Sequence, residues 1–336
     1  MLKSLEDPQA RVRLEALRAL AAVSELGQGT VIAAVAACLS DKEESVQDAA
    51  AQALMGLSRP GDETALRAVI ERLGDRASQN RCAALRALAH LADRGNPAAI
   101  AVVAERLEDS LAKVRATAAA SLRKLAERGD RNAIACVAPR VEHRFAPVRH
   151  EAIRVLSDLS GWDDYEVARL LADRIADQDP KVRRAAELAL LEVAWRGGSE
   201  YHEFIVAEVA GFIDCPDDEV HRAAISSLAR IAGGGSAAAM SAVVGHLGVG
   251  WKDTLIAAVQ RLPRLHRRGD AAAISAAAAC LGFGSGEVRT AAVQVVAHLA
   301  ERGDATAAEA LLARLGDEAA AVRCSALAAL ADVLPE

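Results

Sequence analysis

The sequence predicts an all-α protein, a right-handed α-α superhelix built from about ten helical hairpins of 34 residues each. Three observations predict this fold class. One residue pattern returns at a fixed interval, the apolar residues inside each copy follow helical spacing, and the composition favours closely packed helices. Of the 336 residues, 52% are hydrophobic but only 3% are aromatic. An apolar content that is mostly Ala, Leu and Val suits packed helices better than β-sheets.

The repeat is defined by an anchor position that is usually Val. Successive anchors lie 34 residues apart, except for one step of 38 between Val182 and Val220, where four residues are inserted near Gly198–Tyr201. The anchors cover the whole chain: Val12, Val46, Asn80, Val114, Val148, Val182, Val220, Thr254, Val288 and Val322. Apolar residues recur 4, 7, 8 and 11 positions after each anchor, which predicts one stripe along a helix, termed helix B. A second apolar helix, helix A, precedes each anchor.

Helix ends are marked by a glycine 15 positions after nearly every anchor and by an N-capping residue directly after it. In the fifth repeat Asp163 replaces this glycine. Glycine adopts the left-handed conformation that ends a helix at no steric cost. The side-chain oxygen of the next residue accepts hydrogen bonds from the first amides of the following helix. The three RGD sequences, at 128–130, 268–270 and 302–304, are therefore predicted to be helix stops and caps and not adhesion motifs.

Two charged positions complete the repeat. Asp stands five residues before the anchor (Asp7, Asp41, Asp75, Asp109, Asp177, Asp317), and Arg stands one after it (Arg13, Arg81, Arg115, Arg149, Arg183, Arg289, Arg323). The resulting pattern, Asp followed by Val-Arg-x-x-Ala-x-x-Ala-Leu, resembles the HEAT repeat in the short form related to phycobilisome-lyase HEAT-like repeats. The resemblance covers essentially the whole chain and implies a ladder of hydrogen bonds between Asp and Arg of neighbouring repeats. It indicates the fold and leaves the function open.

We expect residues 1–336 to form a single HEAT-like solenoid, because a lone hairpin cannot bury its apolar stripe and stacked neighbours can. The first helix A is truncated to the residues MLKSLED, and the repeats within 145–287 are divergent. Neither end of the chain has an evident polar capping repeat, so we expect a fragment of a longer chain or a subunit whose ends are covered by partners.

Aromatic residues mark the divergent repeats. All nine lie between residues 145 and 283, and several fall at turns instead of in the apolar stripes. Aromatic side chains at such edges can anchor a partner protein; the alternative is that they fill gaps between irregularly packed repeats. The positions 6 and 10 after the anchor should form the concave face of the helix B layer, with a mild basic bias that could receive an acidic peptide or helix. The predicted partner-binding residues are Phe145, Trp162, Trp195, Tyr201, Arg230, Trp251, Arg264 and Phe283.

Composition excludes several classes of function. With 40 basic and 46 acidic residues the net charge is −6, so we expect no nucleic-acid partner. No run of 18 uncharged apolar residues occurs, so we expect no membrane insertion. Six scattered cysteines without a CxxC pair are expected to stay reduced, in the cytoplasm or another reducing compartment.

Enzymes with similar repeats are the alternatives. Deoxyhypusine hydroxylase, a HEAT-type enzyme, holds two irons with four His-Glu pairs in matching repeats, and this chain has His150-Glu151 and His202-Glu203 in different registers. Phycobilin lyases would need a pigment pocket, and alkylpurine DNA glycosylases with HEAT-like folds a basic, aromatic groove. We expect none of these: the sequence predicts a non-catalytic scaffold or adaptor for protein partners, without a metal or cofactor.

Overall fold

The computed structural model describes residues 1–334 apart from residues 60, 233–235, 237–238, 241 and 243–251. Within these ranges the chain forms only helices and turns, and no strand. The chain divides into two compact units, unit 1 (Met1–Val167) and unit 2 (Ala168–Glu336). The predicted all-α solenoid of helical hairpins is confirmed, whereas the single array over 1–336 stays a prediction.

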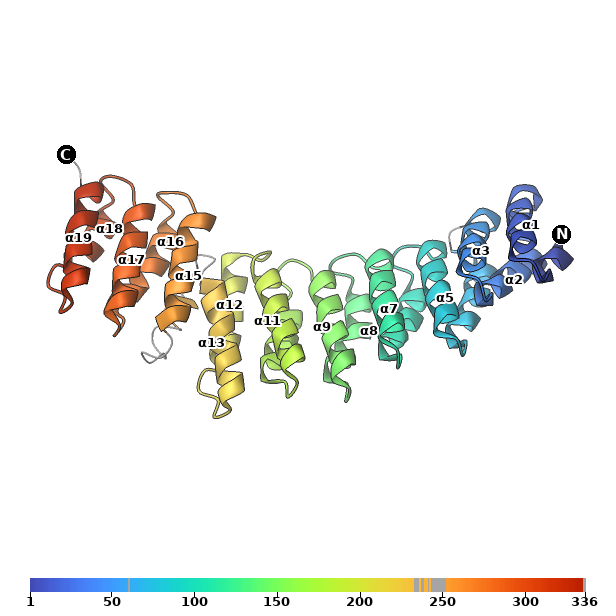
Figure 1. Cartoon of the computed structure of the whole chain (residues 1–336), viewed down its shortest axis with the longest axis horizontal. Helices are drawn as coiled ribbons and strands as arrows, with labels where there is room; N and C mark the ends of the chain where they lie inside the picture. Colours follow the sequence, from blue (N-terminus) through green and yellow to red (C-terminus); the bar gives the residue numbers. More distant parts are fainter. Residues whose placement is uncertain (60, 233–235, 237–238, 241, 243–251, 335–336) are drawn as a thin grey trace. The chain divides into compact units, whose positions relative to one another are not determined.

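Unit 1 is a stack of hairpins in which the B helices follow one another in sequence order (Figure 1). Its B helices are α1 (Ala10–Val23), α3 (Glu44–Leu57), α5 (Ser78–Leu91), α7 (Ala112–Leu125) and α9 (Ala146–Leu159). Its A helices are α2 (Gly29–Ala37), α4 (Glu63–Ile70), α6 (Pro97–Glu105) and α8 (Arg131–Val137). Short 3-10 helices precede the B helices: η1 (Leu2–Glu6), η2 (Cys38–Ser40), η3 (Glu71–Gly74), η4 (Arg106–Glu108) and η5 (Ala138–Glu142).

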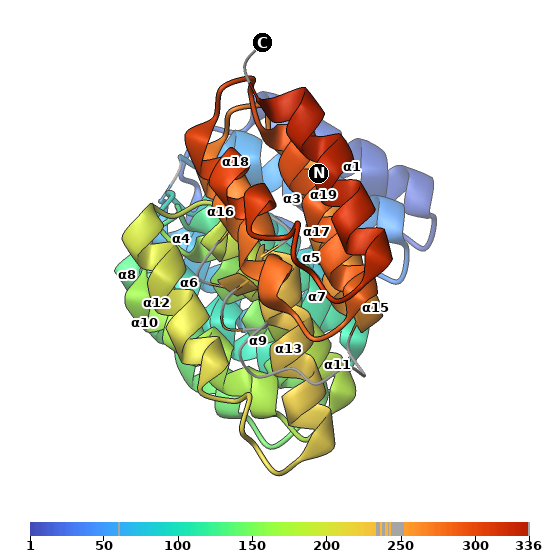
Figure 2. The ribbon, with the colours of Figure 1, turned by 90° about the vertical axis from the view of Figure 1, so that its left-hand side faces the viewer.

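Unit 2 repeats this arrangement, and the division between the units falls inside α10 (Tyr165–Asp173), which η6 (Arg174–Ala176) follows. Its B helices are α11 (Pro180–Ala194), α13 (Asp218–Ala232), α15 (Lys252–Leu265), α17 (Gly286–Leu299) and α19 (Ala320–Val333). Its further A elements are α12 (Ser199–Ala210), α16 (Ala271–Ala279), η8 (Cys280–Gly282) and α18 (Ala305–Leu312). Figure 2 shows the two layers, with α16 and α18 on one side and α15, α17 and α19 on the other.

The four inserted residues lengthen a helix A. Helix α12 has 12 residues, whereas α2 and α16 have nine each. Because four residues make about one helical turn, most of the insertion is absorbed as an extra turn and the hairpin is kept.

The apolar stripes form the core of each unit, as the repeat predicts. The anchors Val46, Val114, Val182, Val288 and Val322 are fully buried. Many core positions are Ala, and small side chains let neighbouring helices approach closely.

The turns after six of the B helices carry the predicted left-handed glycine, which also links neighbouring repeats. Gly197, after α11, is not among the glycines with positive φ. Six glycines have φ between 77° and 84°: Gly27, Gly61, Gly95, Gly129, Gly269 and Gly303. In the fifth repeat Asp163 takes this position and adopts φ 51°. Each of these glycine N–H groups donates to the carbonyl of the last B-helix residue of the following repeat, at 2.6–2.9 Å. The left-handed turn therefore aims a backbone donor at the next hairpin.

The predicted N-caps are confirmed. The residue after the turn accepts hydrogen bonds from the first amides of helix A at Asp62, Asn96, Asp130, Asp164, Ser236, Asp270 and Asp304. The RGD sequences thus act as helix stop and cap.

Replacing Gly95 by Ala should lower the free energy of unfolding by about 1 kcal/mol, because its φ of 80° is strained for a residue with a Cβ. No atom lies within 4 Å of the added methyl group, so the cost is conformational and not steric. The matched control is Gly74→Ala in η3, where φ is not positive and the space is also open. Thermal and urea unfolding followed by circular dichroism compare the two variants, and equal stabilities would contradict the assignment.

The Arg–Asp ladder that the resemblance implies is seen among the described residues at Arg13, Arg81 and Arg289. Arg13, Arg81 and Arg289 each donate from Nε and Nη2 to both carboxylate oxygens of the Asp 28 residues later, at 2.7–2.9 Å. The acceptors are Asp41, Asp109 and Asp317. In each case Nη1 donates to two backbone carbonyls of the arginine's own turn between helix A and helix B, which holds the guanidinium fork toward the next repeat. Such bidentate pairs combine strength with fixed geometry.

The ladder makes stability dependent on pH at the acid end. Hydrogen bonds from Arg289 lower the pKa of Asp317 and outweigh the opposing effect of burial. The carboxylate therefore stabilises the fold above the pKa of an unfolded Asp, about 3.9. This contribution is lost as the pH falls through the lower folded pKa.

Asp317→Asn should cost about 2–3 kcal/mol at pH 7, because Arg289 keeps its buried charge, loses its bidentate partner and retains only the exposed Glu318. Below about pH 4 the difference between wild type and variant should shrink, because the wild-type Asp also becomes neutral. Urea unfolding across pH 2–7 measures both effects. Asp48→Asn is the control, since its ion pair with Arg86 is exposed and should contribute little; a difference for Asp317→Asn that stays constant with pH would contradict the ladder's role.

Candidate functional site

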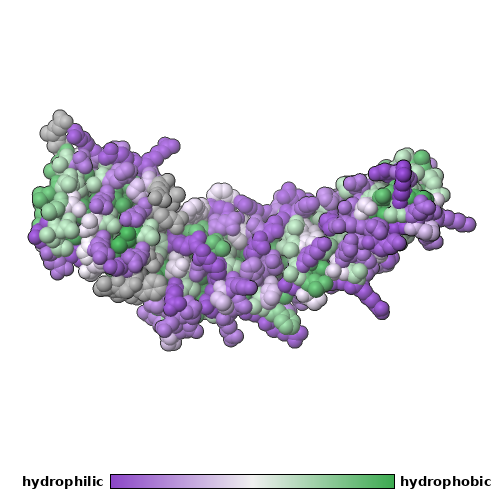
Figure 3. Space-filling view, in the orientation of Figure 1, coloured by the Kyte–Doolittle hydropathy of each residue, from purple (hydrophilic) through white to green (hydrophobic). Residues whose placement is uncertain are grey.

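The outer face of the B helices is the first candidate surface, and it is largely hydrophilic (Figure 3). The predicted outward positions 6 and 10 after the anchor are exposed or half-exposed where their side chains are described. Polar contacts join neighbouring helices across this face: Lys124 Nζ lies 3.2 Å from His90 Nε2, and Arg86 Nη2 lies 3.2 Å from Asp48 Oδ1. Burial, and then the charge of Lys124, lower the pKa of His90, so a neutral His90 can accept a hydrogen bond from the ammonium group.

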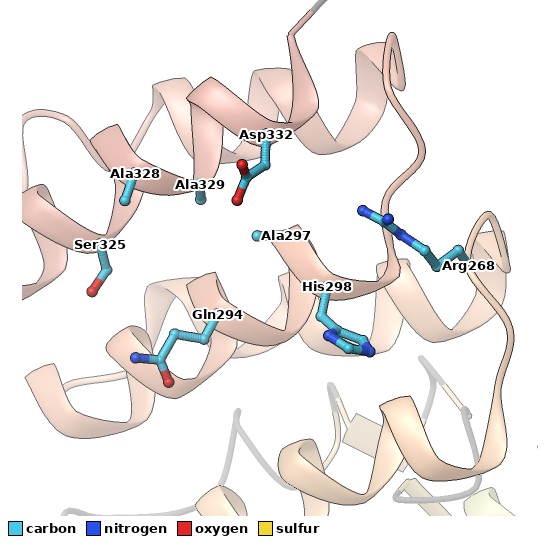
Figure 4. Close-up of a pocket in the computed structure, with 8 residues that line it drawn as sticks. All are labelled: Arg268, Gln294, Ala297, His298, Ser325, Ala328, Ala329 and Asp332. Atoms are coloured by element: carbon cyan, nitrogen blue, oxygen red, sulfur yellow. The ribbon is translucent and has the colours of Figure 1, made fainter.

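In unit 2 this face is hollowed between α17 and α19. A cavity of about 410 Å³ is lined by Arg268, Gln294, Ala297, His298, Ser325, Ala328, Ala329 and Asp332. Asp332 on α19 and Arg268, from the turn before α16, lie at its rim (Figure 4). A second cavity of about 610 Å³ shares these two residues and adds Glu301 and Arg302. Both cavities have charged groups on their walls, which suits a polar protein segment better than a pigment that needs apolar enclosure.

Exposed aromatic residues at turns form the second candidate surface. Trp162 follows α9, Trp195 ends α11 and Phe145 precedes α9; their exposed fractions are 83%, 54% and 54%. The structure therefore places these three predicted residues where a partner can reach them. Arg230 lies half-exposed on α13. Trp251 and the side chain of Arg264 lie outside the described residues.

The burial of two other aromatic residues corrects the prediction. Tyr201 is 1% exposed and Phe283 is 4% exposed, so both belong to the core and cannot anchor a partner. Tyr201 lies in the first turn of α12 and points into the packed layer. Phe283 stands at the ladder position of an Asp, and the residue 28 positions earlier, where the ladder has Arg, is the fully buried Leu255. An apolar pair has replaced the ion pair there.

Tyr165 is an exposed aromatic residue that the sequence prediction missed. It begins α10 and is 43% exposed, three residues after Trp162. No sequence signal distinguished it, because Tyr201 also lies in the first turn of an A helix and is buried. Trp162, Asp163 and Tyr165 are termed the aromatic turn below.

The two His-Glu pairs do not gather further metal ligands. His150 Nδ1 lies 3.8 Å from Glu151 Oε1, and Arg154 Nη1 lies 3.7 Å from Glu151 Oε2. The interaction with His150 contributes most to the lowered pKa of Glu151, although 3.8 Å is too long for a hydrogen bond. His202 lies on α12 in unit 2, and burial lowers its pKa. Among the described residues no group of three or more His, Cys, Asp or Glu side chains could hold a metal ion.

The cysteines and the helix lengths add two further findings. All six cysteines are free, and burial raises the pKa of Cys280 to about 12, which makes a reactive thiolate unfavourable there.

Among the described helices, none is both long enough and apolar enough to cross a membrane.

Comparison with known proteins agrees with the hairpin geometry. Residues 1–89 match the family model of HEAT repeats. Residues 1–89 are therefore HEAT repeats. A hairpin of the same kind, with a left-handed glycine and an Arg–Asp pair, recurs beyond residue 89 as far as Asp317. HEAT repeats commonly form scaffolds for protein–protein interaction.

The crystal structure of an engineered protein aligns with 20% identity over 99% of this chain and 97% of that chain, with a TM-score of 0.43. No curated protein matches the sequence at a significant level.

Tyr201→Ala should destabilise unit 2 by about 3–4 kcal/mol, because a fully buried aromatic ring is replaced by a cavity. Trp195→Ala, which removes a half-exposed ring from the same unit, should cost less than about 1 kcal/mol. Urea unfolding of the two variants measures the difference. A near-neutral Tyr201→Ala would show that the ring is not part of the core.

Proposed function

We infer that the protein is a non-catalytic scaffold that binds other proteins through the exposed aromatic residues of its divergent repeats and through the outer face of its B helices. The observation that carries this proposal is Trp162, whose side chain is 83% exposed on an ordered turn. A large aromatic ring left in solvent contributes little to folding, whereas Trp is among the residues that contribute most to protein interfaces.

The aromatic turn is held in place from several sides. Asp164 is buried, caps the amide of Val167 at 3.3 Å and accepts a hydrogen bond from Arg131 at 3.3 Å. Gly161 packs so closely on Gly129 that an added Cβ would lie 3.2 Å from its Cα. The backbone is therefore fixed while the ring of Trp162 remains accessible. A preorganised aromatic group loses little conformational entropy on binding.

The cavities on the outer face of α17 and α19 support the same function. Their walls offer donors on Arg268 and His298 and an acceptor on Asp332. Such mixed charges favour recognition of a protein segment of complementary charge.

Trp162→Ala and Trp195→Ala should each reduce the capture of protein partners without unfolding the chain. The tagged protein and its variants are expressed in the native source, purified by affinity, and their partners quantified by mass spectrometry. Loss of an interface tryptophan of this kind costs about 2 kcal/mol or more, which corresponds to roughly thirtyfold weaker binding. The expected result is that the same set of proteins is depleted in at least one tryptophan variant.

Leu26→Ala is the matched control. Leu26 is 58% exposed and stands 14 positions after its anchor Val12, the register that Trp162 has after Val148, but it lies outside the divergent repeats. Its replacement should leave capture unchanged. Full retention of every partner by both tryptophan variants would remove the aromatic residues from the proposal.

A further inference from the structure

The departures from the Arg–Asp ladder are informative because another group usually replaces the missing pair. Gln47 stands at a ladder Arg position, and its Nε2 donates to Asn80 Oδ1 at 2.9 Å. Arg183 faces Cys215 in the ladder register and donates instead to Glu219 Oε2 at 3.1 Å. At Leu255 and Phe283 the pair is apolar, as described above. The partner position of His221 is Val249, which lies outside the described residues. In each described case the chain supplies its own substitute.

Arg115 has no such substitute. Its Nη1 donates to the carbonyls of Asp109 and Ser110 at 2.8 and 3.0 Å, the same two bonds that orient the fork in the complete ladder pairs. The residue 28 positions later, where Asp should stand, is His143. Arg115 Nε is buried and has no hydrogen-bond partner among the described atoms. A buried donor without an acceptor costs free energy, so the fork is held toward an acceptor that this chain does not provide.

His143 replaces only part of the missing aspartate. Its Nδ1 accepts the N–H of Phe145 at 3.2 Å, just as Asp109 Oδ1 accepts the N–H of Leu111 at 3.0 Å in the preceding repeat. Because Nδ1 accepts, the proton of a neutral ring is on Nε2, which lies 3.9 Å from Glu108 Oε2. Neither ring nitrogen is then left as an acceptor for Arg115.

The nearby acids are already engaged, and the rim of the site is cationic and aromatic. Arg81 holds both oxygens of Asp109, and Arg140 Nη2 lies 3.0 Å from Glu108 Oε1. The guanidinium carbon of Arg144 lies 4.6 Å from the ring centre of Phe145, and both side chains are exposed. An acidic group that approaches Arg115 therefore meets a second cation and an apolar ring.

We propose that Arg115 is a binding site for a carboxylate side chain of a partner protein. A glutamate or aspartate in an extended acidic segment binds the part-exposed Arg115 guanidinium beside His143, which stands at the position of Asp41, Asp109 and Asp317 in the complete pairs. Residues next to this carboxylate contact Arg144 and Phe145. This proposal rests on the proposed scaffold function and specifies the chemistry of one partner. A charge-assisted bond to an oriented fork is the strongest contact this surface offers.

The experiment measures binding of a short fluorescent peptide of alternating glutamate and alanine by anisotropy, with the glutamine version as the matched probe. Wild type should bind the glutamate peptide and not the glutamine peptide. Arg115→Gln should weaken binding about tenfold or more, because the fork is lost. Arg81→Gln is the control: its fork is filled by Asp109, so its loss should lower stability and leave peptide affinity unchanged.

His143→Asp provides a test that does not depend on removing Arg115. The new carboxylate stands at the ladder position and should occupy the fork from within the chain. The variant should therefore melt at a higher temperature than wild type and bind the glutamate peptide about tenfold more weakly. The two changes in opposite directions distinguish occupation of the site from damage to the fold.

Three results would overturn the proposal: wild type binding neither peptide, equal binding of the two peptides, or an affinity unchanged in both Arg115→Gln and His143→Asp. An equal loss of binding in Arg81→Gln would also overturn it, because the effect would then reflect general charge. The scaffold function is judged separately by partner capture with the tryptophan variants. If the tryptophan variants lose partner capture but the peptide experiment gives one of these contradicting results, the scaffold function is retained and the Arg115 site is rejected.

Discussion

Hydrogen bonding between successive repeats is the constraint on which the structure depends. A hairpin of two short helices cannot bury its apolar stripe alone, so it must be placed accurately against its neighbours. At six turns a left-handed glycine donates its N–H to the last B-helix carbonyl of the next repeat. At the opposite end of three of these hairpins an arginine fork binds the aspartate of the next repeat. Where both ends are bonded, the spacing of the helices and the 34-residue register are fixed together.

The ladder distinguishes arginines whose donors are used within the chain from an arginine whose donors can bind a partner. Where the pair is complete, as at Arg81 and Asp109, its donors and acceptors are used within the chain. At Leu255 and Phe283 both charges are gone and two buried apolar side chains remain, which avoids the cost of removing charges from water. At Arg115 the arginine is kept but the aspartate is replaced by His143. The fold therefore orients a guanidinium group whose Nε has no acceptor within the chain.

Aromatic residues show how much of the candidate surface could be predicted. Their confinement to residues 145–283 is visible in the sequence and indicates the divergent repeats. Their roles are not visible, because Trp162 and Tyr201 both lie near turns and yet one ring is solvated and the other fully buried. The two rings have exposed fractions of 83% and 1%, a difference that residue type and distance from a turn do not predict. Tyr165 was missed for the same reason, since exposure depends on packing and not on residue type.

The sequence by itself determined the helical hairpins, their register, the helix caps and six left-handed glycine turns. These features depend on residues close together in the chain, whose conformational preferences are local. The sequence did not show that Asp163 would take the left-handed conformation, at φ 51°, or that Gly197 would not. Only the tertiary structure decided that the turn glycines bond to the next repeat, that Tyr201 and Phe283 are buried, and that the Arg115 fork lacks an acceptor. Each of these depends on atoms about 30 or more residues away, whose positions follow from the stacking of whole hairpins.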